Sequence, residues 1–373
     1  MVYQSHFLYR LKIIFIFILV KLKFVDFLLP KRWRDQFPSG WNNHMFWIAF
    51  KSGGRKVFFE YYCKLDRPQS YQPKIIVSPE YQLTEQEIKG FYQNGFLPAF
   101  DVLSSQEAEA VRQHLVELVQ MESQVYSYTR GDYKFAAQKD KKNTNIQLLN
   151  ETERYFYNKL NAWDRHLEDS ILLNLFKSPA ITERCAQLLA PELVLWRTNF
   201  FDTPPFSNGS TWHQSSTFFA LDMKESILQP PNVRELFVLT CWIALTDAPK
   251  ERSCMMFIPG SNREIYPTIT ATGDSDKAER IYGKYGERLD DEVNLKQVKY
   301  AEAKAGQCII FCERVVHGST KNITDRHRWS VVGRVVGKNT GIYSKRMRKE
   351  GLNMKVYDVE NIKLDCWKPC PIR

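Results

Sequence analysis

The sequence predicts an α+β fold in which a β-sandwich or barrel core is decorated by N-terminal helices. Helical signals dominate before residue 190, whereas the later chain consists of short apolar runs rich in Val, Ile, Phe and Trp. Gly, Pro, Asn and Asp bound these runs, as expected for strands joined by turns. Helices followed by many strands indicate a sheet that packs or closes on itself with helices outside. A chain of 373 residues can bury one large core, or one core plus a smaller appendage.

Two capping signals predict the first helices of the main domain. Thr84–Glu87 fits a capping box, apolar residues follow it at helical spacing, and Gly95 fits a C-terminal stop. Ser104–Glu107 repeats the capping pattern, and the apolar stripe after it predicts a second helix to about Met121. The sequence therefore predicts two capped helices ahead of the strands.

The remaining elements are predicted from composition and periodicity. Residues 131–145 are polar and Lys-rich, which indicates a mobile loop, and further helices are predicted around residues 151–160 and 179–189. Five apolar runs predict the principal strands: Leu193–Phe201, Leu236–Leu245, Cys254–Ile258, Gln307–Phe311 and Ser330–Val336.

Three prolines between residues 66 and 79 indicate a linker, so the main domain is expected to start at Tyr81. The chain then divides into three parts. Residues 1–80 form a basic, partly apolar N-terminal extension with its linker, residues 81–340 the main domain, and residues 341–373 a C-terminal tail.

Positive charge is concentrated in residues 1–56. They hold ten Lys and Arg against two Asp, a net charge of +8 out of +10 for the whole chain. The main domain is therefore nearly neutral, which gives no support for nucleic-acid binding.

The same extension holds the apolar run Ile13–Val20, which ends at Lys21 and Lys23. A run of this length is too short to span a bilayer, which needs about 20 residues, and no small-residue cleavage site follows it. Two interpretations have equal weight. The segment is either an interfacial helix that lies on an anionic membrane or a helix that packs on the core.

The eight cysteines are scattered and form no CxxC pair. We interpret them as mostly free, buried thiols in a reducing compartment, which favours a cytoplasmic protein, with or without peripheral membrane contact through residues 1–56. Cys308 and Cys312 could share one face of a strand and bind a metal, although two small core residues are the favoured interpretation.

Two histidines and a late arginine carry the chemistry. His213 stands in the stretch Ser210–Phe218, His317 follows 104 residues later, and Arg328 lies 11 residues beyond it. Two neutral imidazoles on one face of a non-haem iron leave positions open for a bidentate 2-oxo acid and for O2. The distal carboxylate of the 2-oxo acid needs a fixed cation, which the planar fork of an arginine supplies. Arg334 has the strand parity of Arg328 and should point to the same side.

Position 215 departs from the usual site of this kind. A third ligand normally comes from a carboxylate two residues after the first histidine, but this position is Ser215. A neutral hydroxyl is a poor iron ligand, although it could donate a hydrogen bond to a halide or a water. Asp222 and Glu225 are nearby carboxylates that could supply a displaced ligand, and Asp202 is another on a separate segment.

Seven stretches between residues 81 and 336 carry a family resemblance. They are Glu87–Phe96, Asp164–Asp169, Leu195–Phe201, Trp212–Gln214, Thr240–Ala248, Phe257–Ser261 and Ala305–Phe311. In this order they resemble the phytanoyl-CoA dioxygenase superfamily, and within it they look most like the 2-oxoglutarate-dependent non-haem iron chlorinating enzymes (halogenases). The resemblance implies a double-stranded β-helix core of the jelly-roll or cupin-like kind, with N-terminal helices packed outside. It also implies Fe(II), 2-oxoglutarate, O2 and chloride as cofactors.

Carried over by position, the resemblance makes His213 and His317 the iron ligands and Arg328 the residue that binds the 2-oxoglutarate carboxylate. Other matched positions line the pocket for 2-oxoglutarate and halide: Thr240, Trp242 and Arg334. In the chlorinating enzymes the carboxylate position is Ala or Gly, and chloride binds iron in its place. Ser215 departs from both patterns, and Ser216 stands where a relative can carry Asp.

The residues and the resemblance together favour an oxidative halogenase. It would chlorinate an unactivated carbon of an amino-acyl, acyl or related small-molecule substrate, free or tethered to a carrier protein, as in natural-product biosynthesis. A hydroxylase of the same superfamily is the alternative, because a water beside Ser215 would allow oxygen insertion. A catalytically inactive oxygenase fold that serves as a binding module is the third, and the presence of His213, His317 and Arg328 together argues against it.

Overall fold

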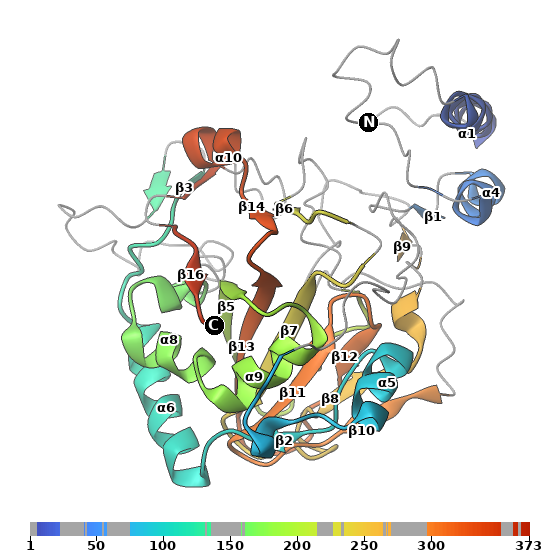
Figure 1. The fold of residues 1–373 in the computed structure, drawn as a ribbon. Coiled ribbons are helices and arrows are strands. Elements are labelled where there is room, and N and C mark those ends of the chain that lie inside the picture. The colour runs from blue at the N-terminus through green and yellow to red at the C-terminus, as the bar shows by residue number, and fades with distance from the viewer. Residues whose placement is uncertain are drawn as a thin grey trace.

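The computed structural model describes residues 6–22, 41, 43–53, 56–57, 75–130, 133–135, 158, 161–214, 227–232, 235–263, 266, 268–269, 297–351, 361–364 and 367–373. Over these residues a six-stranded antiparallel sheet lies at the centre, with a three-stranded sheet beside it (Figure 1). Helices that precede the strands in the sequence pack on the outer side of the large sheet. The α+β class with N-terminal helices, predicted from the sequence, is confirmed.

The large sheet joins segments that are far apart in the sequence. Its order is β16 (Cys370–Pro371), β5 (Leu193–Thr203), β13 (Arg328–Gly337), β7 (Val238–Ala244), β11 (Gln307–Cys312) and β2 (Phe100–Asp101). Strand β13 pairs on both edges, with β5 and with β7, and eight of its ten residues are buried. A strand covered on both faces is rich in apolar residues, and β13 has five such side chains beside its polar residues Arg328, Ser330 and Arg334. Polar side chains on β13 are therefore rigidly placed.

The small sheet faces the large one and carries one of the two histidines. It consists of β10 (Lys299–Ala301), β8 (Met255–Phe257) and β12 (His317–Ser319). Phe257 of β8 lies between the sheets, with its ring centroid 5.2 Å from that of Phe311 in β11 and 4.4 Å from that of Phe96. Two antiparallel sheets that close around this aromatic core form the double-stranded β-helix expected from the resemblance.

The capped helices begin and end where the sequence predicts. Helix α5 (Glu85–Asn94) has a capping box at Thr84 and ends at Gly95, whose φ of 90° lies in the left-handed region. Helix α6 (Ser105–Leu118) has the same box at Ser104. Two helices and three short 3-10 turns follow or flank them: α8 (Ser170–Phe176), α9 (Pro179–Leu188), η1 (Pro79–Tyr81), η3 (Arg165–Leu167) and η5 (Ser261–Arg263). The helix expected around residues 151–160 falls almost wholly outside the described residues.

Two segments differ in character from what their composition suggests. The stretch predicted as a mobile loop contains strand β4 (Tyr133–Phe135), which pairs with β3 (Ser127–Arg130) and through it with β15 (Asn361–Lys363). The loop prediction is wrong there, because the polar composition of the stretch hides a short hairpin with the strand that directly precedes it. Residues 341–373 contribute β15 and three further elements: β14 (Gly341–Ile342), which pairs with β6 (Leu228–Gln229), helix α10 (Lys345–Glu350) and edge strand β16.

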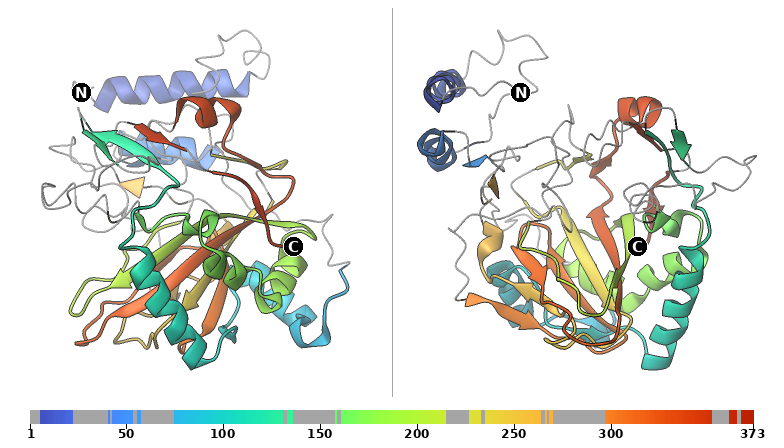
Figure 2. Two further views of the ribbon diagram at one scale, coloured as in Figure 1. Left: turned by 90° about the vertical axis from the view of Figure 1, so that its left-hand side faces the viewer. Right: turned by 180° about the vertical axis from the view of Figure 1, so that it is seen from behind.

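The N-terminal extension forms a pair of helices. Helix α1 (His6–Lys21) packs on α4 (Asn43–Ser52), and β1 (Lys56–Val57) pairs with β9 (Thr268–Ile269). Figure 2 shows both helices at one end of the molecule, with α1 outermost. Among the helices that the structure describes, none is long and apolar enough to cross a membrane.

Gly333 of β13 allows helix α8 to approach the sheet, and a side chain there should destabilise the fold. A Cβ at this position would lie 2.8 Å from Cζ of Phe176 and closer still to two other ring atoms. We expect Gly333→Val to lower the free energy of unfolding by about 1–3 kcal/mol, as overpacking does. Urea denaturation measures the change.

Gly90→Ala in α5 is the control, because nothing lies within 4 Å of the added Cβ. Replacing a helical glycine with alanine should raise the free energy of unfolding by up to about 1 kcal/mol. A Gly333→Val protein as stable as the parent would contradict the close packing of α8 on β13.

Candidate functional site

Two histidines lie side by side where the small sheet meets the preceding segment. An isolated antiparallel bridge pairs His213 with His317, and each backbone N–H donates to the other residue's carbonyl oxygen at 2.9 Å. The ring centroids are 4.3 Å apart, with their planes inclined at 52°. Residues that are distant in the sequence thus become cross-strand neighbours whose rings can reach a single metal ion.

Each imidazole is fixed in one tautomer by its own backbone. Nδ1 of His213 lies 2.7 Å from the carbonyl oxygen of Thr211, and Nδ1 of His317 lies 2.8 Å from that of Val315. A carbonyl oxygen can only accept a hydrogen bond, so Nδ1 carries the proton in both rings and Nε2 keeps its lone pair. Metal-binding histidines are oriented in this way by a hydrogen bond from the other ring nitrogen. The donor set therefore fits a metal ion.

Electrostatics favour the neutral form of both rings. Burial lowers the pKa of His213, and the positive charge of Arg334 lowers it further. Burial lowers the pKa of His317 well below its ordinary value, and the neighbouring His213 adds to this effect. Because a metal binds the neutral imidazole, little proton release has to accompany binding at neutral pH.

The surroundings of the histidines are aromatic and well hydrogen-bonded. Phe311 of β11 packs against His317, with ring centroids 4.7 Å apart. Gln214, next to His213, is buried, and its amide donates to the carbonyl oxygen of Arg314 at 2.6 Å and accepts from N–H of Tyr266 at 2.9 Å. The hydrogen bonds of Gln214 fix the backbone that carries His213, and the ring of Phe311 covers one side of His317.

Arg328, the first residue of β13, is a buried cation with unused hydrogen-bonding capacity. Its Nη1 donates to Oγ of Ser330 at 2.6 Å, its Nη2 donates to Oγ of Ser253 at 3.2 Å, and its Cζ lies 5.6 Å from the ring centroid of Trp242. Burial lowers its pKa to about 10. Within the described residues Nε is buried without a partner, and no carboxylate forms an ion pair with this side chain. A buried arginine held only by hydroxyl groups fits an anionic ligand.

The remaining predicted positions share the inner face of the large sheet. Arg334 lies opposite Thr240 in the register, and Val332 lies opposite Trp242. Strand alternation places Arg334 on the same face as Arg328, as its parity indicates. Oγ1 of Thr240 is buried and has no hydrogen-bond partner among the described residues. Two arginines and a hydroxyl thus line the barrel beside the indole of Trp242.

The carboxylates weighed as a third ligand are placed only in part. Asp202 accepts a hydrogen bond from the ring of His327 at 2.7 Å near the surface, and its pairing with Trp329 turns it away from the inner face. Asp202 is therefore excluded. Ser215, Ser216, Asp222 and Glu225 lie outside the described residues. Within the described part of the chain, no group of three or more His, Cys, Asp and Glu side chains could hold a metal ion.

A buried network beside Arg334 is not foreseen by the sequence analysis. Arg197 of β5 lies opposite Arg334 in the register, and Asp164 balances its charge with Oδ2 3.5 Å from Nε. Arg197 also donates to the hydroxyl of Tyr343 at 2.8 Å, and Tyr126 donates to Asp164. Asp164 and Arg197 both fall in the stretches of the family resemblance, which is the only signal that could have found them.

A second unforeseen feature is the carboxyl group of Glu313, directly after β11. Its side chain is 1% exposed and lies 3.5 Å from Nε of Arg314. Burial raises the pKa of Glu313 to about 7 in spite of this arginine. A carboxyl group that is close to half protonated at neutral pH thus lies at the end of the strand that packs on His317.

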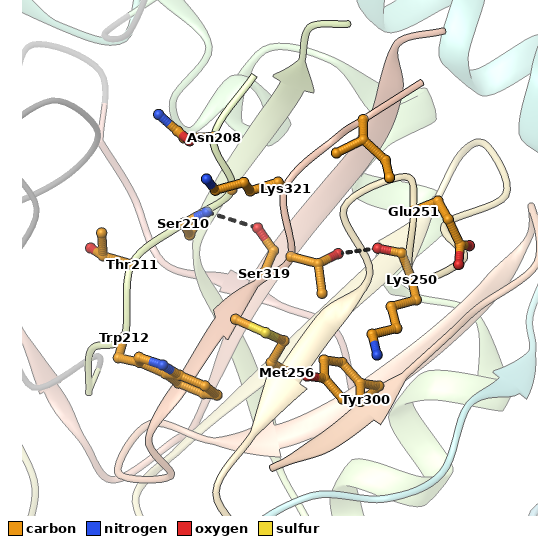
Figure 3. Close-up of a pocket in the computed structure, with 13 residues that line it drawn as sticks. Asn208, Ser210, Thr211, Trp212, Lys250, Glu251, Met256, Tyr300, Ser319 and Lys321 are labelled. Carbon is orange, nitrogen blue, oxygen red and sulfur yellow. Dashed lines mark hydrogen bonds between the residues drawn. The ribbon is translucent and has the colours of Figure 1, made fainter. Parts of the chain in front are cut away.

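A cavity of about 940 Å³ lies on the other side of the small sheet (Figure 3). Met256 and Tyr300 line it and pair with each other, one position along from Phe257, so strand alternation turns them away from the histidines. Residues 208–212 and 319–321 form much of the remaining wall. The cavity therefore adjoins the segments that carry the histidines, while its wall at Met256 and Tyr300 faces away from them.

Comparison with known proteins finds a matching family model and similar sequences and folds. Residues 91–330 match the family model described as phytanoyl-CoA dioxygenase (PhyH). The zebrafish (Danio rerio) phytanoyl-CoA dioxygenase domain-containing protein 1 is 23% identical over 270 residues, which cover 66% of this chain and 87% of that protein. Ectoine dioxygenase of Bordetella parapertussis is 25% identical over 173 residues, 44% of this chain and 53% of that protein. The solved structure of CytC3 with Fe(II) and alpha-ketoglutarate is similar at 18% identity and a TM-score of 0.49, covering 75% of this chain and 86% of that chain.

We expect His317→Ala to weaken anaerobic Fe(II) binding by more than about 100-fold, because losing a ligand should exceed the loss caused by removing a supporting contact. Isothermal titration calorimetry measures the affinity. His114→Ala is the matched control. The ring of His114 forms a hydrogen bond of 2.8 Å with Asp169 and is not part of the site. Unchanged affinity in the His317→Ala protein would exclude the histidine pair as the metal site.

Glu313 should make stability depend on pH. The pKa of a glutamate in the unfolded chain is 4.5, whereas the pKa of Glu313 in the folded protein is about 7. Between these two pH values the folded state therefore binds a proton that the unfolded state has lost. Its contribution is fully present below pH 4.5 and is lost as the pH rises through 7, a change of about 3 kcal/mol. In urea denaturation, the free energy of unfolding of the parent should fall by that amount relative to Glu313→Gln as the pH is raised from below 4.5 to above 7. Parallel pH profiles would contradict the burial of this carboxyl group.

Proposed function

This chain belongs to the phytanoyl-CoA dioxygenase family of iron(II)- and 2-oxoglutarate-dependent oxygenases, and we propose that His213 and His317 hold its iron while Arg328 binds its 2-oxoglutarate. Bound together, these two cofactors and O2 supply the oxidising power needed to attack an unactivated carbon. The observation that carries the proposal is the pair of neighbouring imidazoles, each oriented by a hydrogen bond from Nδ1 to a backbone carbonyl oxygen. The barrel that contains them also contains a buried arginine without a carboxylate partner among the described residues.

The protein's own side chains then have separate tasks. Arg328 would receive the distal carboxylate of 2-oxoglutarate, because its guanidinium is held in place by Ser253 and Ser330 and its Nε–H has no partner within the described part of the chain. Arg334 adds positive charge near the histidines and so favours anions there. Phe311 packs against His317 and limits access of water to it. The site would thus be dry and positively charged, which strengthens the binding of an anionic co-substrate.

Oxygen insertion is the reaction that we place first. Curated relatives of this chain are named as dioxygenases, including ectoine dioxygenase. With a water rather than a protein carboxylate at the third position, the same site would replace a C–H bond of the substrate with a C–OH bond. The enzyme would then act as a hydroxylase.

Chlorination is the second candidate, and Ser215 is the observation that favours it. Position 215 lacks the carboxylate that a hydroxylase of this kind normally supplies, so a halide could bind in its place. The positive charge of Arg334 would help to hold such an anion. The product would then carry C–Cl in place of C–H. We propose small amino-acyl, acyl or related molecules as substrates in either case, free or tethered to a carrier protein.

Mass spectrometry of turnover with and without chloride separates the two reactions. We expect succinate and a product heavier by one oxygen in chloride-free buffer, and a chlorinated product only if chloride replaces the water. Ser215→Asp should abolish any chlorination and preserve or increase hydroxylation, because the new carboxylate fills the third position. Ser216→Asp, which adds the same charge one residue away, is the control and should retain the parent's product ratio.

A parent protein that forms no succinate with Fe(II), 2-oxoglutarate and every candidate substrate would instead support an inactive binding module. Equal chlorination by the parent and by Ser215→Asp would contradict the assignment of position 215.

A further inference from the structure

The outer face of α1 is apolar and exposed to solvent. Phe7, Leu11, Ile14, Phe15 and Ile18 have exposed fractions between 43% and 66%. They recur at three- and four-residue intervals, which places them on one face of the helix. An apolar patch of this kind on a protein surface marks an interaction site.

The opposite face of α1 is already occupied. Ile13 is buried against Phe46 and Ala49 of α4, and Ile16 and Val20 pack around them. Helix α1 is therefore apolar on two opposite faces, of which α4 covers one. A helix that is apolar all round is normally covered all round, so the outer face calls for a second partner.

Cations border this outer face, and the described part of the helix pair has no acidic residue. Helical geometry places Lys12 at one edge of the face and Lys21 at the other, whereas Arg10 donates to backbone carbonyl oxygens of α4. Lys51 of α4 adds a fourth positive charge, and residues 6–22 and 43–53 contain neither Asp nor Glu. The partner is therefore expected to be apolar in its interior and anionic at its surface.

We propose that α1 docks this protein in the plane of an anionic lipid membrane. The helix has 16 residues and a length of about 24 Å, which is too short to span a hydrocarbon core of about 30 Å. Lying flat, it would bury its apolar face among the acyl chains while Lys12 and Lys21 reach the headgroups. A second copy of the chain is a poor occupant of the face, because it would bring an equally basic helix pair and the charges would repel.

The position of α4 sets the orientation of the docked molecule. Met45 and Ile48 of α4 belong to a buried cluster that includes Val238 and Val336. These two valines lie opposite each other, two residues beyond the Thr240–Arg334 pair on the same face of β7 and β13. Docking through α1 would therefore turn one end of the barrel toward the lipid. This is the end at which Val238 and Val336 lie, on the α4 side of the Thr240–Arg334 pair (Figure 2).

Co-sedimentation of the full chain with vesicles tests this proposal. The protein should pellet with vesicles of phosphatidylcholine mixed with phosphatidylglycerol, much less with phosphatidylcholine alone, and less as salt is raised. Leu11→Asp combined with Ile18→Asp should reduce binding by more than about 10-fold, because both substitutions place a charge on the apolar face that would enter the membrane. The control combines Ile76→Asp with Ile171→Asp, which makes the same charge change at apolar positions 97% and 48% exposed elsewhere, and it should bind like the parent.

Fe(II) affinity should be the same in all three proteins, which shows that the variants fold. A parent chain that stays in the supernatant with anionic vesicles would overturn the proposal, as would equal binding by the Leu11→Asp/Ile18→Asp protein. Light scattering provides the test of the rival occupant. A dimer that this double variant dissociates would assign the face to a second copy of the chain instead.

Discussion

Two backbone hydrogen bonds between His213 and His317 constrain everything that the site can do. They join segments that lie 104 residues apart in the sequence and set the imidazoles side by side. The same backbone then fixes the tautomers, because the carbonyl oxygens of Thr211 and Val315 accept from Nδ1. Ligand geometry therefore follows from the fold of the small sheet, before any metal is present.

The second constraint is a buried positive charge. Arg328 enters the barrel at the start of β13, and two serine hydroxyls orient it without neutralising it. By contrast Arg197, on the neighbouring strand, is paired with Asp164 and Tyr343 and has a structural role. This difference in pairing distinguishes an arginine that supports the fold from one that is available to a ligand, a distinction that residue type alone cannot make.

The sequence predicted correctly the helix ends, which are determined by residues adjacent in the chain. The capping boxes at Thr84 and Ser104 and the stop at Gly95 need only a few adjacent residues, and they appear as expected. The histidines and Arg328 could be singled out as candidates because metal and carboxylate chemistry restricts residue type. The Asp164–Arg197 pair was missed because its partners are distant in the sequence and leave no local pattern. Strand β4 was missed although its partner β3 directly precedes it, because the hairpin they form lies in a predominantly polar stretch. The surroundings of Ser215 depend on residues outside the described part of the chain.

The central claim is that two imidazoles and one arginine define the cofactor site. A crystal structure of the protein grown without oxygen, with Fe(II) and 2-oxoglutarate, tests it most directly. The account predicts iron on Nε2 of His213 and His317, and the distal carboxylate of 2-oxoglutarate on Arg328. Iron bound elsewhere, a protein carboxylate as a third ligand, or a 2-oxoglutarate that does not contact Arg328 would contradict it.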